Sequence, residues 1–145
     1  MQRPIVLLAE PDDDSRAMYA DYLAVRGFEV IVVTTSDDAL LEAPHVDVIV
    51  TGARLAGTVD GIELVRRLRG NDQSGRRPII VLTACAFEAD QQLAMSAGCD
   101  TFLTKPCVPD RLETEIRRLL GARGRGRKTL ARAHLEAKRP TPKAS

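Results

Sequence analysis

Short apolar runs alternate with amphipathic stretches along the first 120 residues of the chain. Each run is rich in aliphatic, often β-branched residues and is bounded by turn-forming residues, which predicts a strand buried on both faces. The expected strands are 5–9, 28–33, 46–51, 78–83 and 101–103. Between them, apolar residues recur every three or four positions, which predicts five helices: one ending at Arg26, then 36–42, 61–69, 88–97 and 109–120.

Residues at the expected helix ends support these boundaries. Ser36 can cap the second helix at its start, and Pro44 terminates it. A glycine stands directly after each of the other four helices, where it can adopt the left-handed conformation that closes a helix: Gly27, Gly70, Gly98 and Gly121. The first helix carries Met18, Tyr22 and Val25 on one face, the third turns Ile62, Val65 and Leu68 inward, and the last has Leu112, Ile116, Leu119 and Leu120 at helical spacing.

Strands that alternate with helices imply right-handed crossovers and a parallel sheet covered on both faces. We therefore predict an α/β fold, a flavodoxin-like doubly wound sheet of five parallel strands in the order 2-1-3-4-5. In such sheets a ligand binds beyond the carboxyl ends of the strands, where the strand order reverses. That crevice would lie between the first and third strands, beside Glu10 and Gly52.

The distribution of charge divides the chain near Gly121. The 145 residues carry a formal net charge of +1, but residues 1–120 hold 13 Lys/Arg against 19 Asp/Glu, whereas residues 121–145 hold 8 Lys/Arg against 1 Glu. We expect a domain over 1–120 and a basic, flexible tail over 121–145, in which 129–138 could form one marginal helix. Electrostatic association of this tail with nucleic acid is one alternative for function.

Composition argues against several classes of protein. No apolar run approaches the roughly 18 residues that a membrane span needs, and the N-terminus lacks a signal-peptide pattern, so a cytoplasmic location without membrane contact is expected. Cys85, Cys99 and Cys107 are odd in number and lack metal-ligand spacing. They are interpreted as reduced thiols, with a redox role for Cys85 or Cys107 as the alternative.

Polar groups follow four of the strands and would meet at one edge of the sheet. They are Glu10-Pro11-Asp12, Gly52, Thr83-Ala84 and Lys105-Pro106. Carboxylates suit Mg²⁺, and an ammonium with a hydroxyl suits a phosphoryl group. This edge is therefore a candidate phosphate pocket, although phosphoryl transfer also needs a nucleophile.

The motifs at these strand ends resemble the receiver (CheY-like) domain of bacterial two-component response regulators. They are 5–10 (IVLLAE), 47–55 (DVIVTGARL), Asp60-Gly61, 80–84 (IVLTA), Ala97-Gly98 and Lys105-Pro106, and the resemblance covers about residues 4–120. It implies a phosphorylated aspartate at the end of the third strand and two Mg²⁺-holding acids after the first. It further implies that Thr83 and Lys105 contact the phosphoryl group and that Phe102 is the switch aromatic.

The positions that depart from the receiver pattern include those that carry the phosphorylation chemistry in the family. Gly52 stands at the acceptor position and Pro11 at the second acid position, while Ala56 replaces a usual loop proline. Without a carboxylate at position 52 no acyl phosphate can form there, and a missing nucleophile abolishes a covalent step. We expect no cofactor, with Glu10 and Asp12 only weak candidate Mg²⁺ ligands.

The resulting expectation is a degenerate receiver, or pseudo-receiver, that is not an enzyme and signals through phosphorylation-independent protein–protein contact. Its partner would be a histidine kinase or another regulator, or a second copy of the chain. The resemblance places the contact on the face made by the helix at 88–97, the strand at 101–103 and the last helix, with Glu88, Gln92, Arg111 and Arg117. A phosphorylatable regulator with a surrogate acceptor remains an alternative.

Overall fold

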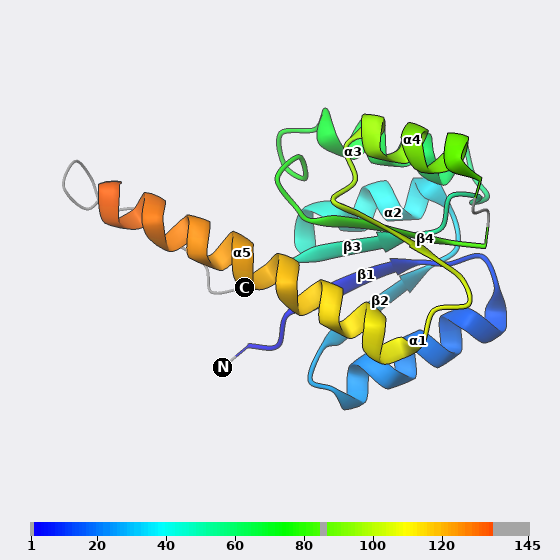
Figure 1. Cartoon of the computed structure of the whole chain (residues 1–145), viewed down its shortest axis with the longest axis horizontal. Helices are drawn as coiled ribbons and strands as arrows, with labels where there is room; N and C mark the ends of the chain where they lie inside the picture. The colour runs from blue at the N-terminus through cyan, green and yellow to red at the C-terminus, as the bar shows by residue number, and fades with distance from the viewer. Residues whose placement is uncertain (1, 85–86, 135–145) are drawn as a thin grey trace.

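A computed structural model describes residues 2–84 and 87–134 as a central parallel sheet between two layers of helices (Figure 1). The strands are β1 (Ile5–Ala9), β2 (Glu29–Val33), β3 (Val48–Thr51), β4 (Ile79–Thr83) and β5 (Thr101–Thr104). The helices are α1 (Asp13–Val25), α2 (Ser36–Glu42), the 3₁₀ turn η1 (Ala43–His45), α3 (Gly61–Arg69), α4 (Glu88–Ala97) and α5 (Pro109–His134). The strand order is β2-β1-β3-β4-β5, which confirms the predicted flavodoxin-like fold.

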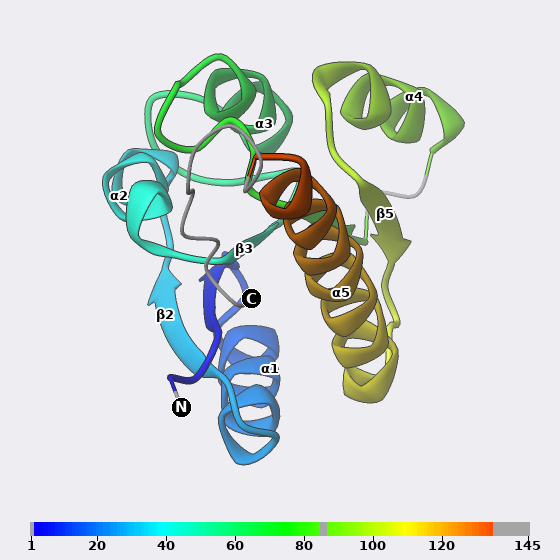
Figure 2. The ribbon, with the colours of Figure 1, turned by 90° about the vertical axis from the view of Figure 1, so that its left-hand side faces the viewer.

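The sheet buries a different hydrophobic cluster on each face. On one face, α2, α3 and α4 cover alternate residues of the strands, such as Leu7, Ile49 and Val81. On the other face, α1 and α5 cover the intervening residues, such as Leu8 and Val50. Figures 1 and 2 show these two helical layers on opposite sides of the sheet. The near-continuous apolar strands of the sequence are explained, since both faces are buried.

The parallel register brings the chemically interesting residues to one edge of the sheet. Ala9 pairs with Thr51 of β3, and Thr83 pairs with Thr104 of β5. The residue after each strand therefore emerges at the same edge, and Gly52 N–H donates to the Ala9 carbonyl at 2.9 Å. This is the edge at which the sequence predicted a crevice.

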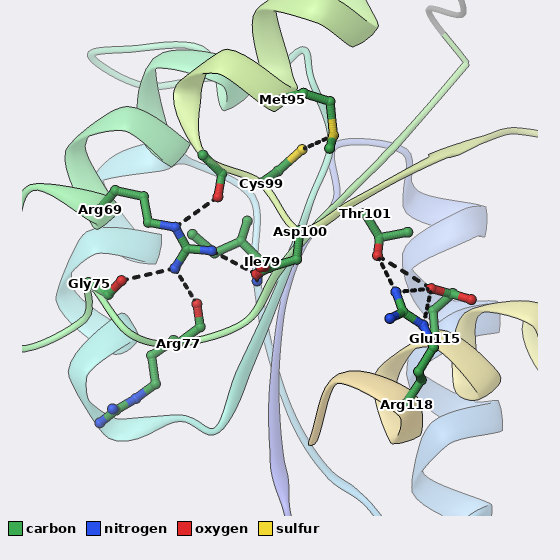
Figure 3. Close-up of polar contacts among 11 residues, drawn as sticks. Arg69, Gly75, Arg77, Ile79, Met95, Cys99, Asp100, Thr101, Glu115 and Arg118 are labelled. Atoms are coloured by element: carbon green, nitrogen blue, oxygen red, sulfur yellow. Dashed lines mark hydrogen bonds and ion pairs between the residues drawn. The ribbon is translucent and has the colours of Figure 1, made fainter. Parts of the chain in front are cut away.

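At the opposite edge, one arginine joins several segments of the chain. Arg69, at the end of α3, donates to the carbonyls of Gly98 and Gly75 at 2.8 and 3.0 Å and to the Arg77 carbonyl (Figure 3). It also pairs with Asp100 at 2.7 Å. One guanidinium thus joins α3, the loop before β4 and the turn between α4 and β5. The polar segment 71–77 is accordingly fixed to the domain by these contacts.

The predicted bounds of α2 and α3 are confirmed, whereas the caps of these two helices differ from the prediction and the predicted end of α5 is wrong. Thr35, not Ser36, caps α2, because its Oγ1 accepts from Asp38 N–H at 3.1 Å while Ser36 is already inside the helix. Gly27 and Gly98 adopt the expected left-handed conformation, but Gly70 closes α3 with φ −81°. Gly121 does not end a helix at all, since α5 runs through it to His134.

The apolar face assigned to α1 also differs from the structure. Met18 and Val25 are exposed, and Tyr19 and Leu23 are the buried residues. The Tyr19 hydroxyl donates to the Cys107 carbonyl at 2.6 Å, so this face is turned toward the segment before α5. The periodicity was ambiguous because apolar residues lie on two adjacent lines of the same helix.

The extension of α5 is the largest difference from the predicted elements. The buried residues Leu112, Ile116 and Leu120 pack on the sheet, and the helix then projects beyond it (Figure 1). Each of the three glycines in this helix, Gly121, Gly124 and Gly126, costs only about 1 kcal/mol relative to alanine, and the arginine, leucine and alanine residues around them favour the helix. Residues 135–145, and therefore the end of the predicted tail, lie outside the described residues.

Candidate functional site

The carboxylate of Glu10 is the buried centre of the group at the strand ends. Glu10 follows β1 and is 1% exposed. Its Oε1 forms an ion pair with the Lys105 ammonium at 2.7 Å. The angles of this contact are not those of a hydrogen bond. Its Oε2 accepts from the Asp12 N–H at 2.9 Å. The positive charge of Lys105 is thus already balanced by a carboxylate of the same chain.

Asp12 caps the first turn of α1. Its Oδ2 accepts from the Ser15 N–H at 2.8 Å, the usual role of an N-cap. The hydrogen bond with Ser15 lowers the pKa of the exposed Asp12 carboxyl, and the charge of nearby Lys105 acts in the same direction. Asp12 is therefore ionised at neutral pH and already engaged by the helix.

Pro11 packs against the position where a side chain at Gly52 would begin. A Cβ added at Gly52 would lie 3.3 Å from Pro11 Cδ and 3.4 Å from the Arg54 carbonyl oxygen. A contact of 3.3 Å is tight for a Cβ, so the proline ring would have to give way slightly. The backbone of Gly52 is not in the left-handed region, so the fold does not require glycine there.

Gly61, in contrast, is required by the fold. A Cβ at Gly61 would lie 1.7 Å from the Gly52 carbonyl oxygen, because α3 begins directly against the end of β3. The loop between them is also fixed to α2, where the buried Ser36 accepts from Val59 N–H at 3.2 Å and Asp37 accepts from Thr58 N–H at 3.1 Å. This anchoring by Ser36 was not recognised in the sequence.

The remaining strand-end residues complete the edge. Thr83 is buried at the end of β4, and its carbonyl accepts from the Lys105 N–H at 2.8 Å. Ala84 and Pro106 are exposed, and the Lys105–Pro106 peptide bond is cis. Phe102 is partly buried and packs on the cluster under α3 and α4. The structure therefore gathers Glu10, Pro11, Asp12, Gly52, Thr83 and Lys105 at one place, as the strand order predicted.

The family model described as "Response regulator receiver domain" matches residues 6–117, which is almost the whole sheet-and-helix body. The chain belongs to the response regulator receiver family. Receivers are signalling modules of two-component systems that interact with histidine kinases and other signalling proteins.

Curated relatives agree with this assignment. The receiver is 34% identical over 119 residues to the transcriptional regulatory protein AfsQ1 of Streptomyces coelicolor, covering 81% of this chain and 51% of that protein. It is 25% identical over 118 residues to the polar-differentiation response regulator DivK of Brucella ovis, covering 80% of this chain and 95% of that protein. The chain spans about half the length of the first curated relatives it matches, at 51%, 52% and 48%.

Solved receivers have the same fold. The receiver domain of the sensor histidine kinase PA1611 from Pseudomonas aeruginosa, with magnesium in its active-site cleft, superposes with a TM-score of 0.75 and 28% identity, covering 83% of this chain and 99% of that chain. The chemotaxis response regulator CheY4 of Vibrio cholerae gives a TM-score of 0.74 and 26% identity, covering 81% and 99% of the two chains.

The donor set of this receiver does not fit Mg²⁺. Glu10 is paired with Lys105, and Asp12 caps α1. Within the part of the chain that the structure describes, no three acidic, histidine or cysteine side chains are grouped so as to hold a metal ion. Mg²⁺ needs near-octahedral oxygen ligands and gives up its water reluctantly, so one carboxylate paired with a lysine and a second engaged as a helix cap make a poor site.

The two arginines assigned to the partner face lie on different sides of α5. Glu88 and Gln92 are exposed neighbours on α4, and Arg111 is exposed on α5. Arg117, however, turns toward α1: it pairs with Glu113 at 2.8 Å and lies over the Phe28 ring at 4.6 Å. Its assignment to the face with α4 and β5 is therefore wrong, because packing against α1 decides its direction.

Arg118, by contrast, faces β5. Its guanidinium donates to Thr101 Oγ1 at 3.0 Å and to Glu115 Oε1 at 2.8 Å (Figure 3). This arrangement lowers the pKa of Glu115 through the hydrogen bond from Arg118, against a smaller opposing effect of burial. The spacing of residues in the sequence could not show that the adjacent Arg117 and Arg118 contact different neighbours.

None of the helices within the described ranges is both long and apolar enough to cross a membrane.

Burial raises the pKa of Cys99 to about 11 and also raises that of Cys107, so both are thiols at neutral pH. Cys85, the other cysteine assigned an alternative redox role, lies outside the described residues.

Proposed function

We propose that this receiver acts as a pseudo-receiver, which transmits a signal by protein–protein contact and without aspartyl phosphorylation. The observation that carries the proposal is the pairing of Gly52 with Pro11. Position 52 offers no carboxylate, and the proline ring occupies the space beside it. The Lys105–Glu10 ion pair supports the same conclusion, because the cation that would meet a phosphoryl group is already neutralised at 2.7 Å.

A surrogate acceptor finds no support among the neighbouring residues. The Thr51 hydroxyl is buried and donates to the Gly52 carbonyl at 3.0 Å. Asp47 lies at the other end of β3, where it accepts from Ile5 N–H at 2.8 Å. Asp60 caps α3 by accepting from Glu63 N–H at 2.9 Å. Each of these groups already serves the fold.

The proposed contact surface is the face of α4, β5 and α5. It presents Glu88 and Gln92 with the exposed apolar residue Met95 on α4, and Arg111 with the Arg118–Glu115 pair on α5. An exposed apolar residue among polar and charged neighbours suits a protein interface. The occupant is a histidine kinase, another signalling protein or a second receiver, and no cofactor is required.

The test compares partner binding with and without a phosphodonor. The tagged chain is used to capture partners from the native cytoplasm, and a recovered partner is then titrated in purified form with and without acetyl phosphate. Equal affinity in both conditions is expected. The variant E88K/Q92K should bind at least about tenfold more weakly, because it alters the charge of the contact face.

The matched control is E29K/Q73K, which adds the same charge at exposed positions away from α4. It should bind like the wild type. Affinity that appears only after phosphodonor treatment would contradict the proposal, and an equal loss in both variants would move the contact away from this face.

A further inference from the structure

Two basic side chains meet Glu10, the buried acid at the carboxyl edge of the sheet. The Lys105 ammonium pairs with Glu10 Oε1 at 2.7 Å. The Arg16 guanidinium, from the start of α1, donates to the Glu10 carbonyl oxygen at 2.9 Å and pairs with Asp13 Oδ1 at 2.6 Å. The side chains of Lys105 and Arg16 are only 19% and 20% exposed, so the protein covers most of each.

The backbones of both basic residues are hydrogen-bonded to their neighbours. The Lys105 N–H donates to the Thr83 carbonyl at 2.8 Å, which ties the end of β5 to the end of β4. The Arg16 N–H donates to the Asp12 carbonyl at 2.9 Å in the first turn of α1. The positions from which the two side chains reach Glu10 are therefore set by the sheet and by α1.

The acids at this edge are engaged by the chain itself. Glu10 Oε2 accepts from the Asp12 N–H at 2.9 Å, and Asp12 Oδ2 accepts from the Ser15 N–H at 2.8 Å. The hydrogen bonds with Ser15 lower the pKa of the Asp12 carboxyl most, and the charges of Lys105 and Arg16 lower it further. A divalent cation at these carboxylates would therefore face two positive charges that are already in place.

We propose that the Lys105 ammonium, supported by the Arg16 guanidinium, takes the place of a divalent cation at this edge, so that the receiver keeps its contact-competent conformation without Mg²⁺. The proposal rests on the proposed function, because the receiver pattern combines phosphorylation with Mg²⁺. Gly52 and Pro11 contribute no carboxylate here. The buried Glu10 then needs one positive charge, which an ammonium supplies, whereas a hard divalent cation needs several oxygen ligands.

The test measures binding of Mn²⁺, a hard divalent probe, to the purified full chain in metal-free buffer at pH 7. Electron paramagnetic resonance reports the free ion. The wild type should leave the Mn²⁺ signal unchanged at millimolar metal. Millimolar MgCl₂ should also leave the Tm of the wild type equal to its Tm in NaCl of the same ionic strength.

Lys105→Met should bind Mn²⁺ at least about tenfold more tightly than the wild type, because the like charge beside Glu10 has been removed. MgCl₂ should raise the Tm of this variant. Glu10→Gln added to Lys105→Met removes the acid on which the metal would lie and should abolish both effects. Lys105→Arg keeps a cation beside Glu10 and should restore wild-type behaviour, which the loss of a merely structural lysine stem would not predict.

The matched control is Arg76→Met, which removes one positive charge from an exposed position before β4, at the opposite edge of the sheet. Its affinity for Mn²⁺ should stay within about threefold of the wild type, since only the general field of the protein changes. This variant separates a local effect of the ammonium from a change in net charge.

Binding of Mn²⁺ by the wild type as tightly as by Lys105→Met would overturn the proposal, since the ammonium would then not exclude the metal. So would a Lys105→Met protein that gains no affinity, or an equal gain in Arg76→Met. The wild-type titration needs no variant, so it is decisive even if Lys105→Met unfolds. None of these measurements uses a partner or a phosphodonor: a wild type that binds metal but signals without phosphorylation would end this proposal and leave the proposed function intact.

Discussion

Pro11 and Gly52 face each other across the end of the sheet, with the proline ring 3.3 Å from the point where a Cβ at position 52 would lie. The two residues close the acceptor position in different ways. Gly52 removes the nucleophile, and Pro11 fills part of the space that a side chain would enter. A change at either position alone therefore leaves the other obstacle in place.

The contact between these residues can be measured as a coupling free energy. Because Gly52 has ordinary backbone angles, Gly52→Ala should reduce the freedom of the unfolded chain and stabilise the protein by up to about 1 kcal/mol. In the wild type the contact with Pro11 offsets this gain. In a Pro11→Ala background the gain should be larger, by about 0.5 kcal/mol or more, in a double-mutant cycle from chemical denaturation. Additive effects would show that the ring does not restrict position 52.

Gly61→Ala should be far more damaging than Gly52→Ala. The added methyl group would overlap the Gly52 carbonyl oxygen, 1.7 Å away, and neither backbone can move without displacing β3 or α3. We expect a loss of about 3 kcal/mol or more in the free energy of unfolding, the range of severe packing faults. Similar stabilities for the two alanine variants would mean that β3 and α3 do not approach as closely as described.

Replacing Lys105 should destabilise the fold, because the buried Glu10 carboxylate loses its ion-pair partner. Lys105→Met leaves the 1% exposed carboxylate with the Asp12 N–H as its remaining described partner, and should cost about 3 kcal/mol. Adding Glu10→Gln in the double variant removes the unpaired charge and should recover a large part of that loss. Thermal unfolding at pH 7 measures both. A Lys105→Met variant as stable as the wild type would show that the ion pair contributes nothing to the fold.

Glu113 should make part of the stability pH-dependent. Burial by itself raises the pKa of Glu113, but hydrogen bonds from Arg117, Arg26 and Tyr22 outweigh it and lower the pKa below the usual 4.5. Since the folded value lies below the unfolded one, the stabilisation is present above about pH 4.5 and is lost as the pH falls through the folded pKa.

Glu113→Gln should therefore lower stability at pH 7 by about 1 kcal/mol, because a charged hydrogen-bond acceptor is lost. It should also flatten the decline of stability between about pH 5 and 3. Denaturation curves at a series of pH values measure both effects. Glu29→Gln, which removes an exposed carboxylate from β2, is the control and should keep the wild-type profile. An unchanged profile in Glu113→Gln would place the acid-sensitive group elsewhere.

The strands of the sheet could be predicted because the residue pattern that specifies each strand is local in the sequence. Each strand is an apolar run with a turn on either side, and the α/β alternation favours a doubly wound parallel sheet, for which 2-1-3-4-5 is a common order. The group at the strand ends was predictable for the same reason, since parallel strands deliver their last residues to one edge. Lys105 and Glu10 could be placed near each other in this way without any knowledge of side-chain directions.

Features that depend on two distant side chains were not accessible from the sequence. Whether Lys105 would pair with Glu10 or Asp12 depends on which carboxylate is free after α1 has been capped. The direction of Arg117 depends on Phe28 and Glu113, which meet only when α5 packs on α1. The length of α5 was misjudged because Gly121, like Gly124 and Gly126, lowers helix propensity by only about 1 kcal/mol and does not by itself end a helix.

The most direct test of the central claim is the intact mass of the protein after incubation with acetyl phosphate and Mg²⁺, compared with that of G52D and G52D/P11D. The wild type should gain no phosphoryl group, and G52D should gain little because Pro11 still crowds the position. G52D/P11D, which restores both acids of the receiver pattern, should acquire an acid- and alkali-labile phosphoryl group. A wild-type protein that gains one labile phosphoryl group under these conditions would contradict a receiver that works without phosphorylation.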